Sequence, residues 1–186
     1  MLGALLPNYD PITQTISEIG EKGSPFEMPF KIANLFVAVC FVLFSYGVYR
    51  FSVARQLSLV PALLLGFFAA TQLGGFTFES PNPWHNVFGI SSTLGFFAPL
   101  GLAVTWPSTP DLRALCSVSS VVAVLILIAI ALNLSPLFIQ VPYIDEHIGL
   151  VQQLALVFHL WCAYLAMILF RNARAPTHSG IARKAA

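Results

Sequence analysis

Charged side chains are scarce in this sequence of 186 residues. Asp, Glu, Lys and Arg make up only 9% of it, against about 25% in an average soluble protein. A soluble domain of this size has a large surface for its volume and needs polar groups to cover it. The net charge is only +1, so there is no surplus of basic residues to bind a nucleic acid. These shortages exclude a soluble enzyme, a nucleic-acid-binding protein and a disordered chain.

Cysteine is also rare, and the common catalytic motifs are absent. Cys40, Cys116 and Cys162 are odd in number and their spacing fits no zinc or disulfide framework, so we interpret them as small buried hydrophobic residues. The sequence has no Gly-x-Ser-x-Gly, no His-Glu-x-x-His and no glycine-rich phosphate loop. The residues therefore identify no cofactor and no reaction.

Hydrophobic residues, by contrast, make up 57% of the chain, and the mean hydropathy is +0.79. Five apolar runs have the length of about 20 helical residues that crosses a hydrocarbon layer of about 30 Å. These runs are 30–49, 57–78, 85–106, 114–134 and 148–170. No water satisfies the backbone inside a bilayer, and the alternation of a membrane barrel is missing. The sequence therefore predicts an all-α bundle of five transmembrane helices, the third of them kinked at Pro99.

The few charged residues divide unevenly between the two ends of this bundle. One set of loops, together with the C-terminal tail, carries seven basic residues, and the other set carries two. Basic residues favour the cytoplasmic side of a membrane. We therefore expect a multi-pass protein of the cell membrane with an exoplasmic N-terminal segment 1–28, a bundle 29–170 and a basic cytoplasmic tail 171–186.

Residues 10–20 have the pattern of a short helix before the first span. Asp10 is suited to the N-cap and Gly20 to the C-terminal stop. Three isoleucines are spaced to share one face of that helix: Ile12, Ile16 and Ile19. The pattern predicts an amphipathic helix that lies at the exoplasmic interface or caps the bundle.

The tract Tyr9-Asp10-Pro11-x-x-Gln14-x-Ile16-Ser17-Glu18-Ile19-Gly20, directly followed by a span, resembles the opening of a known family. This is the prokaryotic membrane-protein family catalogued as domain of unknown function 998. Two further stretches resemble the same family, namely Phe78-Glu79-Ser80-Pro81 with His85, and Gly149-Leu150-Val151-Gln152-Gln153 followed by Trp161. The resemblance implies a membrane bundle and its topology, but no activity.

The chain departs from the family pattern at two points. The family often has an arginine where this chain has Gln153, so we expect no anionic ligand at that position. The family also usually has a complete span before the Tyr-Asp tract, where this chain has the short apolar patch 1–6. Two alternatives follow, a bundle of five spans or one with a sixth helix upstream.

Polar residues within the spans gather towards the exoplasmic ends, and such residues usually face a cavity or the bundle interior. The candidate ligand-binding residues are Asn34, Gln72, Glu79, His85, Ser92, Gln152 and His159. Asp145, Gln152 and His159 recur every seven residues, so they would form a stripe that descends about 20 Å along the last span. Gln72 and Gln152 are the expected hydrogen-bond partners of His159. We expect a polar pocket that opens to the exoplasmic side.

Three functions are compatible with such a pocket. A binding or accessory protein would hold a lipid, a small amphiphile or a partner helix. A membrane-embedded hydrolase or transferase acting on a lipid would draw on Glu79, His85, Asp145 and His159, and a metal-assisted variant on His85, His147 and Glu146. A transporter needs a continuous polar path, and the cytoplasmic half of the spans holds no charge. Binding is the preferred hypothesis. The expected partners are membrane lipids, a protein partner or a second copy of this chain, and we expect no nucleic acid to bind.

Overall fold

The computed structural model describes residues 2–78, 80, 82–139 and 141–174. In that part of the chain all regular structure is helical, and five helical segments are long and apolar enough to cross a membrane. These segments are Glu27–Ala54, Val60–Thr77, Pro83–Thr105, Arg113–Leu137 and Ile148–Asn172. The prediction of an all-α bundle with five spans is therefore confirmed, and the observed bounds differ from the expected ones by a few residues.

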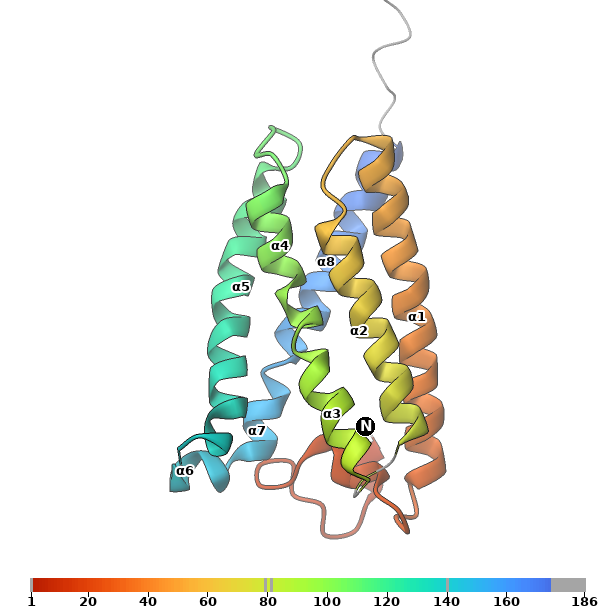
Figure 1. Cartoon of the computed structure of the whole chain (residues 1–186), viewed down its shortest axis with the longest axis vertical. Helices are drawn as coiled ribbons and strands as arrows, with labels where there is room; N and C mark the ends of the chain where they lie inside the picture. The colour runs from red at the N-terminus through yellow and green to blue at the C-terminus, as the bar shows by residue number, and fades with distance from the viewer. Residues whose placement is uncertain (1, 79, 81, 140, 175–186) are drawn as a thin grey trace, which may run out of the picture.

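Two spans are single helices, and three are built from more than one helical segment (Figure 1). The single helices are α1 (Glu27–Ala54) and α2 (Val60–Thr77). The third span consists of α3 (Pro83–Ser92), η3 (Gly95–Phe97) and α4 (Ala98–Thr105), the fourth of α5 (Arg113–Leu134) and η4 (Ser135–Leu137), and the last of α7 (Ile148–Gln153) and α8 (Leu156–Arg174). The short helices outside the spans are η1 (Leu2–Leu5), η2 (Ile16–Gly20) and α6 (Pro142–Asp145).

The third span is interrupted where a proline was expected to kink it. Pro99 has no backbone N–H, and its ring would clash with the carbonyl of Gly95 in a continuous α-helix. The chain forms the 3₁₀ turn η3 there instead. A Cβ at Gly95 would lie 2.4 Å from the Cβ of Phe68, so the absence of a side chain lets the interrupted segment approach α2 closely.

The hydrophobic core extends from the middle of the bundle towards the end where α1 and α8 finish. Its fully buried members include Leu65 and Phe68 of α2, Leu102 of α4, and Phe158 and Leu165 of α8. Trp161 is also buried, and its Nε1–H donates to the Oγ of Ser119 at 2.9 Å. This hydrogen bond ties α8 to α5 inside the core.

Two of the three cysteines are buried, as expected, and one is not. Cys116 and Cys162 belong to the core, whereas Cys40 is exposed on α1. The prediction is wrong for Cys40 because lipid is as apolar as a protein core, so an apolar residue of a membrane helix gains little from burial.

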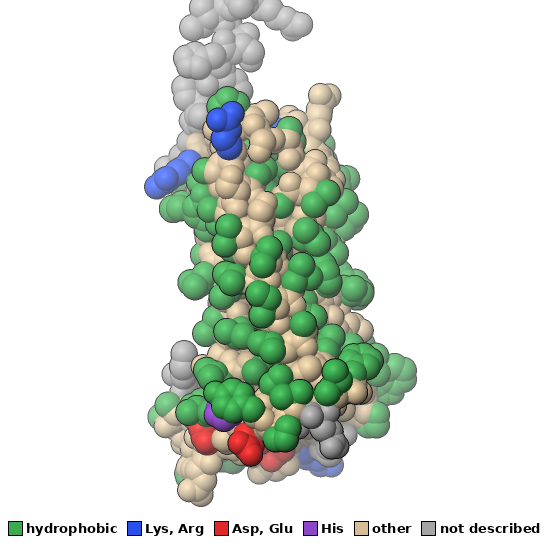
Figure 2. Space-filling model, turned by 90° about the vertical axis from the view of Figure 1, so that its left-hand side faces the viewer, with side chains coloured by type: hydrophobic (Ala, Val, Ile, Leu, Met, Phe, Trp, Pro, Cys, Tyr) green, Lys and Arg blue, Asp and Glu red, His purple; other side chains and the backbone are tan. Residues whose placement is uncertain are grey.

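The two ends of the bundle differ in charge. The end where α1 and α8 finish carries Arg50, Arg55, Arg113 and Arg171, and we call it the basic end. The opposite end, with the N-terminal segment and α6, carries Asp10, Glu18, Glu21, Glu27 and Glu146, and we call it the acidic end. Figure 2 shows apolar side chains over the surface between the two ends. Within the expected tail 171–186, α8 continues to Arg174 and residues 175–186 lie outside the described residues.

Candidate functional site

The N-terminal segment folds on itself by side-chain hydrogen bonds. Asp10 accepts from the backbone N–H of Ile12 at 2.9 Å and from the hydroxyl of Thr13 at 3.0 Å. Glu18 accepts from the backbone N–H and the hydroxyl of Thr15, each at 2.8 Å. The bonds to Asp10 compete with helix formation, so the residues before Thr15 form turns. The bonds between Thr15 and Glu18 are a capping box that begins the 3₁₀ helix Ile16–Gly20.

The expected helix from Asp10 to Gly20 is therefore wrong in its length and type. Of the three isoleucines expected on one buried face, Ile19 is buried, and Ile12 and Ile16 are exposed. Residues 9–20, which we call the strap, instead lie across the acidic end of the bundle (Figure 1). Burial and the nearby Glu18 and Asp10 carboxylates raise the pKa of Tyr9, so its neutral hydroxyl donates to the carbonyls of Gln14 and Thr15 at 3.4 and 3.3 Å.

The strap is held to the start of the last span by three hydrogen bonds. The Oε1 of Gln152 accepts from the N–H of Ile16 at 2.9 Å, and the Nε2 of Gln153 donates to the carbonyl of Pro11 at 2.7 Å. The N–H of Leu150 donates to the carbonyl of Ile12 at 3.1 Å. Gly149 lies so close to the strap that a Cβ there would come within 2.2 Å of the carbonyl oxygen of Gln14.

The connection between α2 and α3 joins the same end of the bundle. The N–H of Lys22 donates to the carbonyl of Ser80 at 3.1 Å. The Nδ1 of His85 lies 2.8 Å from the carbonyl oxygen of Phe78. Because a carbonyl can only accept, Nδ1 carries a proton, and in the neutral form of the ring Nε2 is then the hydrogen-bond acceptor.

A cavity of about 720 Å³ lies behind the strap, within the acidic half of the bundle. Its wall takes residues from all five spans and from Ile16 and Ser17 of the strap. One face of α5 lines it at helical spacing, from Ile126 through Ile130 to Asn133. Five of the seven candidate ligand-binding residues lie along this wall: Asn34, Gln72, His85, Ser92 and Gln152.

Three half-buried side-chain amides in this wall have no hydrogen-bond partner in the described part of the chain. Asn34 of α1, Gln72 of α2 and Asn133 of α5 are half-buried and form no hydrogen bond with any other described residue. An amide left unpaired away from water costs about 1–3 kcal/mol. Each of the three therefore favours a partner from outside the protein.

The hydroxyl groups of the wall are arranged differently. Thr71, Ser92 and Thr93 donate to carbonyls of their own helices at 2.6 to 2.8 Å. Their oxygens remain available as acceptors. Among the described residues that line the cavity there is no Asp, Glu, Lys or Arg. The described wall thus combines uncharged polar groups and the His85 imidazole with apolar side chains.

A family model described as "Protein of unknown function (DUF998)" matches residues 1–170. The chain belongs to the DUF998 family. No curated protein and no solved structure matches it. The three stretches that resemble this family lie at the same end of the bundle, since the strap binds residues 149–153 and Lys22, two residues after the strap, bonds to Ser80 of the loop that follows α2. In this DUF998 protein they enclose the acidic end of the cavity.

His159 does not line the cavity and lies on the outer surface of α8. The expected stripe assumed one continuous helix, but α7 and α8 are separated by a tight turn in which the N–H groups of Leu154 and Ala155 bond three residues back. That turn changes the helical phase and rotates His159 away from Gln152. Its Nδ1 lies 3.2 Å from the carbonyl of Ala155, so the expected bond to Gln72 or Gln152 is not formed.

Among the remaining catalytic and metal candidates, the described side chains do not join His85 at the cavity wall. Glu79 lies outside the described residues, as does the side chain of Asp145. His147 stacks on Tyr143 with ring centroids 4.3 Å apart, and neither it nor Glu146 lines the cavity. Among the described residues no group of three or more His, Cys, Asp and Glu is placed to hold a metal ion.

Several polar residues of the wall were not among the ligand-binding residues expected from the sequence, including Ser17, Thr71, Asn86 and Thr93. Asn86, Gly89 and Thr93 follow helical spacing on α3, so the face that carries Ser92 could have indicated the two polar ones. Ser17 gave no such signal, because it reaches the wall through the docking of the strap.

Proposed function

We propose that this protein is a binding or accessory protein of the membrane that holds a lipid or small amphiphile in the cavity. The observation that carries the proposal is the set of three unpaired amides, on three different helices, in one cavity of a membrane bundle. Polar groups within a membrane are costly and usually mark a binding site. A volume of about 720 Å³ also falls within the range of small-molecule sites, about 300–1,000 Å³.

The composition of the wall favours a ligand with an uncharged, hydrogen-bonding head group. Amides offer both donors and acceptors, and the hydroxyl oxygens add acceptors. A charged head group would find no opposite charge among the described lining residues and would pay a large desolvation cost. Hydroxyl or amide head groups fit this wall, and an ionised phosphate does not.

Apolar residues beside the cavity suit the hydrocarbon part of such a ligand. Ile90 of α3 and Leu137 of η4 line the cavity, and they are 49% and 63% exposed. Residues that both line a cavity and are exposed mark its mouth. A ligand with an apolar chain would place that chain between Ile90 and Leu137 and its head group near the amides.

We infer that the cavity lies on the exoplasmic side of the cell membrane. Seven of the nine basic residues belong to the loops and tail of the basic end, which the positive-inside rule places in the cytoplasm. A reporter that is active only in the cytoplasm, fused after the last residue, tests this. We expect activity from that fusion and none from a fusion before the strap, and the reverse pattern would contradict the orientation.

Native mass spectrometry after extraction in mild detergent tests the binding function. We expect a discrete adduct of a lipid with an uncharged head group on the wild-type chain. Gly89→Leu fills the cavity from α3, where an added Cβ meets no atom within 4 Å, and should remove the adduct. Gly47→Leu, at an equally open glycine on α1 away from the cavity, is the matched control and should keep it.

Two results would contradict the binding function. One is a wild-type protein whose mass equals that of the bare chain or a whole multiple of it, with no adduct. That result would point to a protein partner or to a second copy of the chain. The other is an adduct of a lipid with an uncharged head group that survives in Gly89→Leu. Circular dichroism of each variant separates loss of ligand from loss of fold.

A second function, a membrane-embedded hydrolase or transferase acting on a lipid, is favoured by one observation. The bond to Phe78 leaves the Nε2 of His85 as an acceptor in the cavity wall, which is the state that a general base requires. His85→Ala would then stop product formation from added lipid extract while the bound adduct persists. Identical lipid profiles with wild type and His85→Ala would reject the enzyme.

A further inference from the structure

A second hollow lies at the opposite end of the molecule, between α1 and α8. It has a volume of about 680 Å³. Val48 and Leu169 form its buried floor, and the small residues Gly47 and Ala166 keep it open. An added Cβ at Gly47 would meet no atom within 4 Å. We call this hollow the α1–α8 groove.

Apart from Arg50, Arg55 and Asn172, the residues that line the groove are apolar. Leu43 lines one end and Ala54 the other, which is about 17 Å of helix and about the depth of one leaflet of a hydrocarbon layer of about 30 Å. Phe44 and Phe51 add aromatic wall. The groove therefore has the length and chemistry to hold an acyl chain.

Two arginines line the end of the groove nearest the basic end. Arg50 is exposed, its Nη1 donates to the hydroxyl of Tyr46 at 3.0 Å, and it forms no ion pair with any described residue. A guanidinium has five N–H donors, so most of those of Arg50 are available. The hydrocarbon groove thus ends at a cation that the described part of the protein leaves without a counter-charge.

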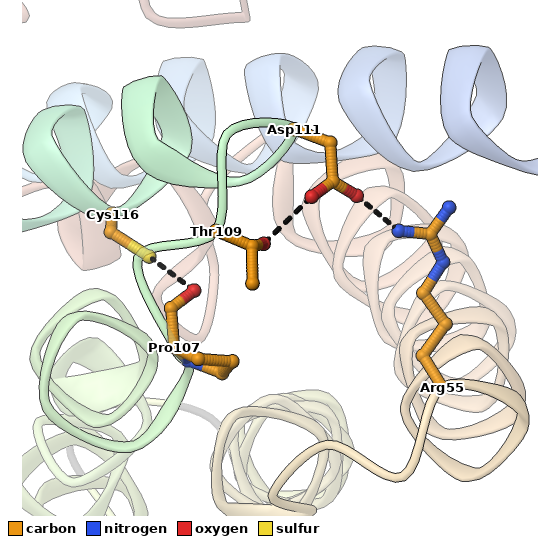
Figure 3. Close-up of polar contacts among 5 residues, drawn as sticks. All are labelled: Arg55, Pro107, Thr109, Asp111 and Cys116. Atoms are coloured by element: carbon orange, nitrogen blue, oxygen red, sulfur yellow. Dashed lines mark hydrogen bonds and ion pairs between the residues drawn. The ribbon is translucent and has the colours of Figure 1, made fainter.

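Arg55 is held in place by the loop between α4 and α5. Its Nη1 donates to Asp111 Oδ2, and the other carboxylate oxygen of Asp111 accepts from Thr109 at 2.7 Å (Figure 3). The guanidinium carbon also lies 4.9 Å from the ring centre of Phe51. Asp111 is the only acidic residue in the loops of the basic end. It offsets one of the two arginines and leaves the charge of Arg50.

We propose that the α1–α8 groove binds an anionic phospholipid. One acyl chain lies along Gly47 and Ala166, and the phosphate lies against Arg50, with Arg55 beside it. Arginine binds phosphate oxygens in a bidentate manner, and basic pockets between transmembrane helices are a known setting for anionic head groups. The site is independent of the uncharged cavity and takes the opposite class of lipid.

Titration of the detergent-solubilised protein with phosphatidylglycerol or phosphatidylcholine, followed by native mass spectrometry, tests this site. We expect one phosphatidylglycerol per chain, bound about tenfold more tightly than phosphatidylcholine. Arg50→Gln should weaken phosphatidylglycerol about fivefold, the value of one arginine near a membrane surface, and leave phosphatidylcholine unchanged. Gly47→Leu should weaken both lipids, because it fills the hydrocarbon part of the groove.

The matched control is Gly89→Leu, which fills the cavity at the acidic end and should bind phosphatidylglycerol like the wild type. Equal binding of the two lipids, or unchanged phosphatidylglycerol binding in both Arg50→Gln and Gly47→Leu, would overturn the proposal. A dimer that Gly47→Leu abolishes would also overturn it, in favour of a second copy of the chain in the groove. Loss of the cavity adduct alone would leave this site intact.

Discussion

The two halves of the third span are joined end to end, yet they pack very differently. In α4, Ala98, Pro99 and Leu102 are buried, whereas α3 has no buried residue. α4 packs on both α2 and α5, while the face of α3 from Asn86 to Thr93 lines the cavity. The break at η3 separates a part of the span that stabilises the bundle from a part that leaves room for a ligand.

The last span repeats this division. α7, at the acidic end, contributes Ile148, Val151 and Gln152 to the cavity wall, and α8 supplies Phe158, Trp161 and Leu165 to the core. Irregular backbone is tolerated inside a membrane where it is buried in protein or lines a cavity. Both breaks lie beside the cavity, with Phe96 and Phe158 in contact at a centroid distance of 4.9 Å. The acidic half therefore holds the cavity, and the basic half holds most of the hydrophobic core.

Gly95→Leu should lower the free energy of unfolding more than any other change considered, because Gly95 lies in η3 where the third span packs tightly against α2. Its side chain would overlap Phe68, whose Cβ and Cα lie 2.4 and 3.0 Å from the added Cβ. Overpacking of this kind costs about 3 kcal/mol of unfolding free energy. Unfolding in mixed detergent measures it, with Gly89→Leu as the partner variant on the loose side. Equal unfolding free energies of the two variants would contradict the difference in packing between the two halves of the third span.

Gly149→Ala should release the strap without unfolding the bundle. The new methyl group would meet the carbonyl oxygens of Gln14 and Pro11 at 2.2 and 2.6 Å, so the hydrogen bonds between the strap and α7 would break at a cost of about 2 kcal/mol. Amide exchange of Ile16 should become much faster, while that of α8 stays slow. Gly89→Ala is the control. Unchanged exchange at Ile16 would contradict the docking geometry.

Gln72→Leu should stabilise the empty protein and weaken binding. Removing an unpaired amide from the cavity wall should raise the unfolding free energy by about 1 kcal/mol, and ligand retention should fall about tenfold. Thermal unfolding with and without added lipid measures both effects. A less stable variant that keeps its ligand would show that this amide serves the fold and not the site.

Asp111→Asn should have the smallest effect, at the basic end. The hydroxyl of Thr109, followed by Arg55, lowers the pKa of Asp111 below its usual value of 3.8. A carboxylate with a lowered pKa stabilises the folded state above about pH 4, and this contribution is lost as the pH falls through the folded-state pKa. Because the side chain is exposed, the contribution is at most about 0.5 kcal/mol.

The unfolding temperature of the wild type, measured from pH 6 to pH 3, should therefore fall slightly more than that of Asp111→Asn. Parallel profiles would show that the ion pair of Figure 3 adds no stability. Such a result would not bear on the binding site proposed in the acidic half of the molecule.

The spans and much of the cavity could be predicted because both depend on features that the sequence displays directly. Run length and hydropathy determine a transmembrane helix. The position of each polar residue along its predicted span then indicated that four residues lie at a similar depth in the membrane: Asn34, Gln72, His85 and Gln152. Pro99 also predicted the interruption of the third span, where the 3₁₀ helix η3 begins at Gly95, four residues before the proline.

Other features depend on three-dimensional contacts. No proline or glycine marks the turn at Leu154 and Ala155, so the rotation of His159 out of the stripe had no signal. The turns of the strap arise because the carboxylate of Asp10 bonds to the backbone of Ile12 and the hydroxyl of Thr13, and an aspartate suits a helix cap equally well. The exposure of Cys40 follows from lipid contact, which composition does not reveal.

Photocrosslinking with a lipid that carries a diazirine on its acyl chain and a neutral hydroxylated head group is the most direct test of the cavity. We predict crosslinked peptides concentrated at Ile90, Ile130 and Leu137 of the cavity, above the level at Leu63 and Val121 on exposed helix faces, and a return to that level in Gly89→Leu. Crosslinks spread evenly over all exposed faces, or unchanged in Gly89→Leu, would contradict the assignment of the acidic half as a binding site.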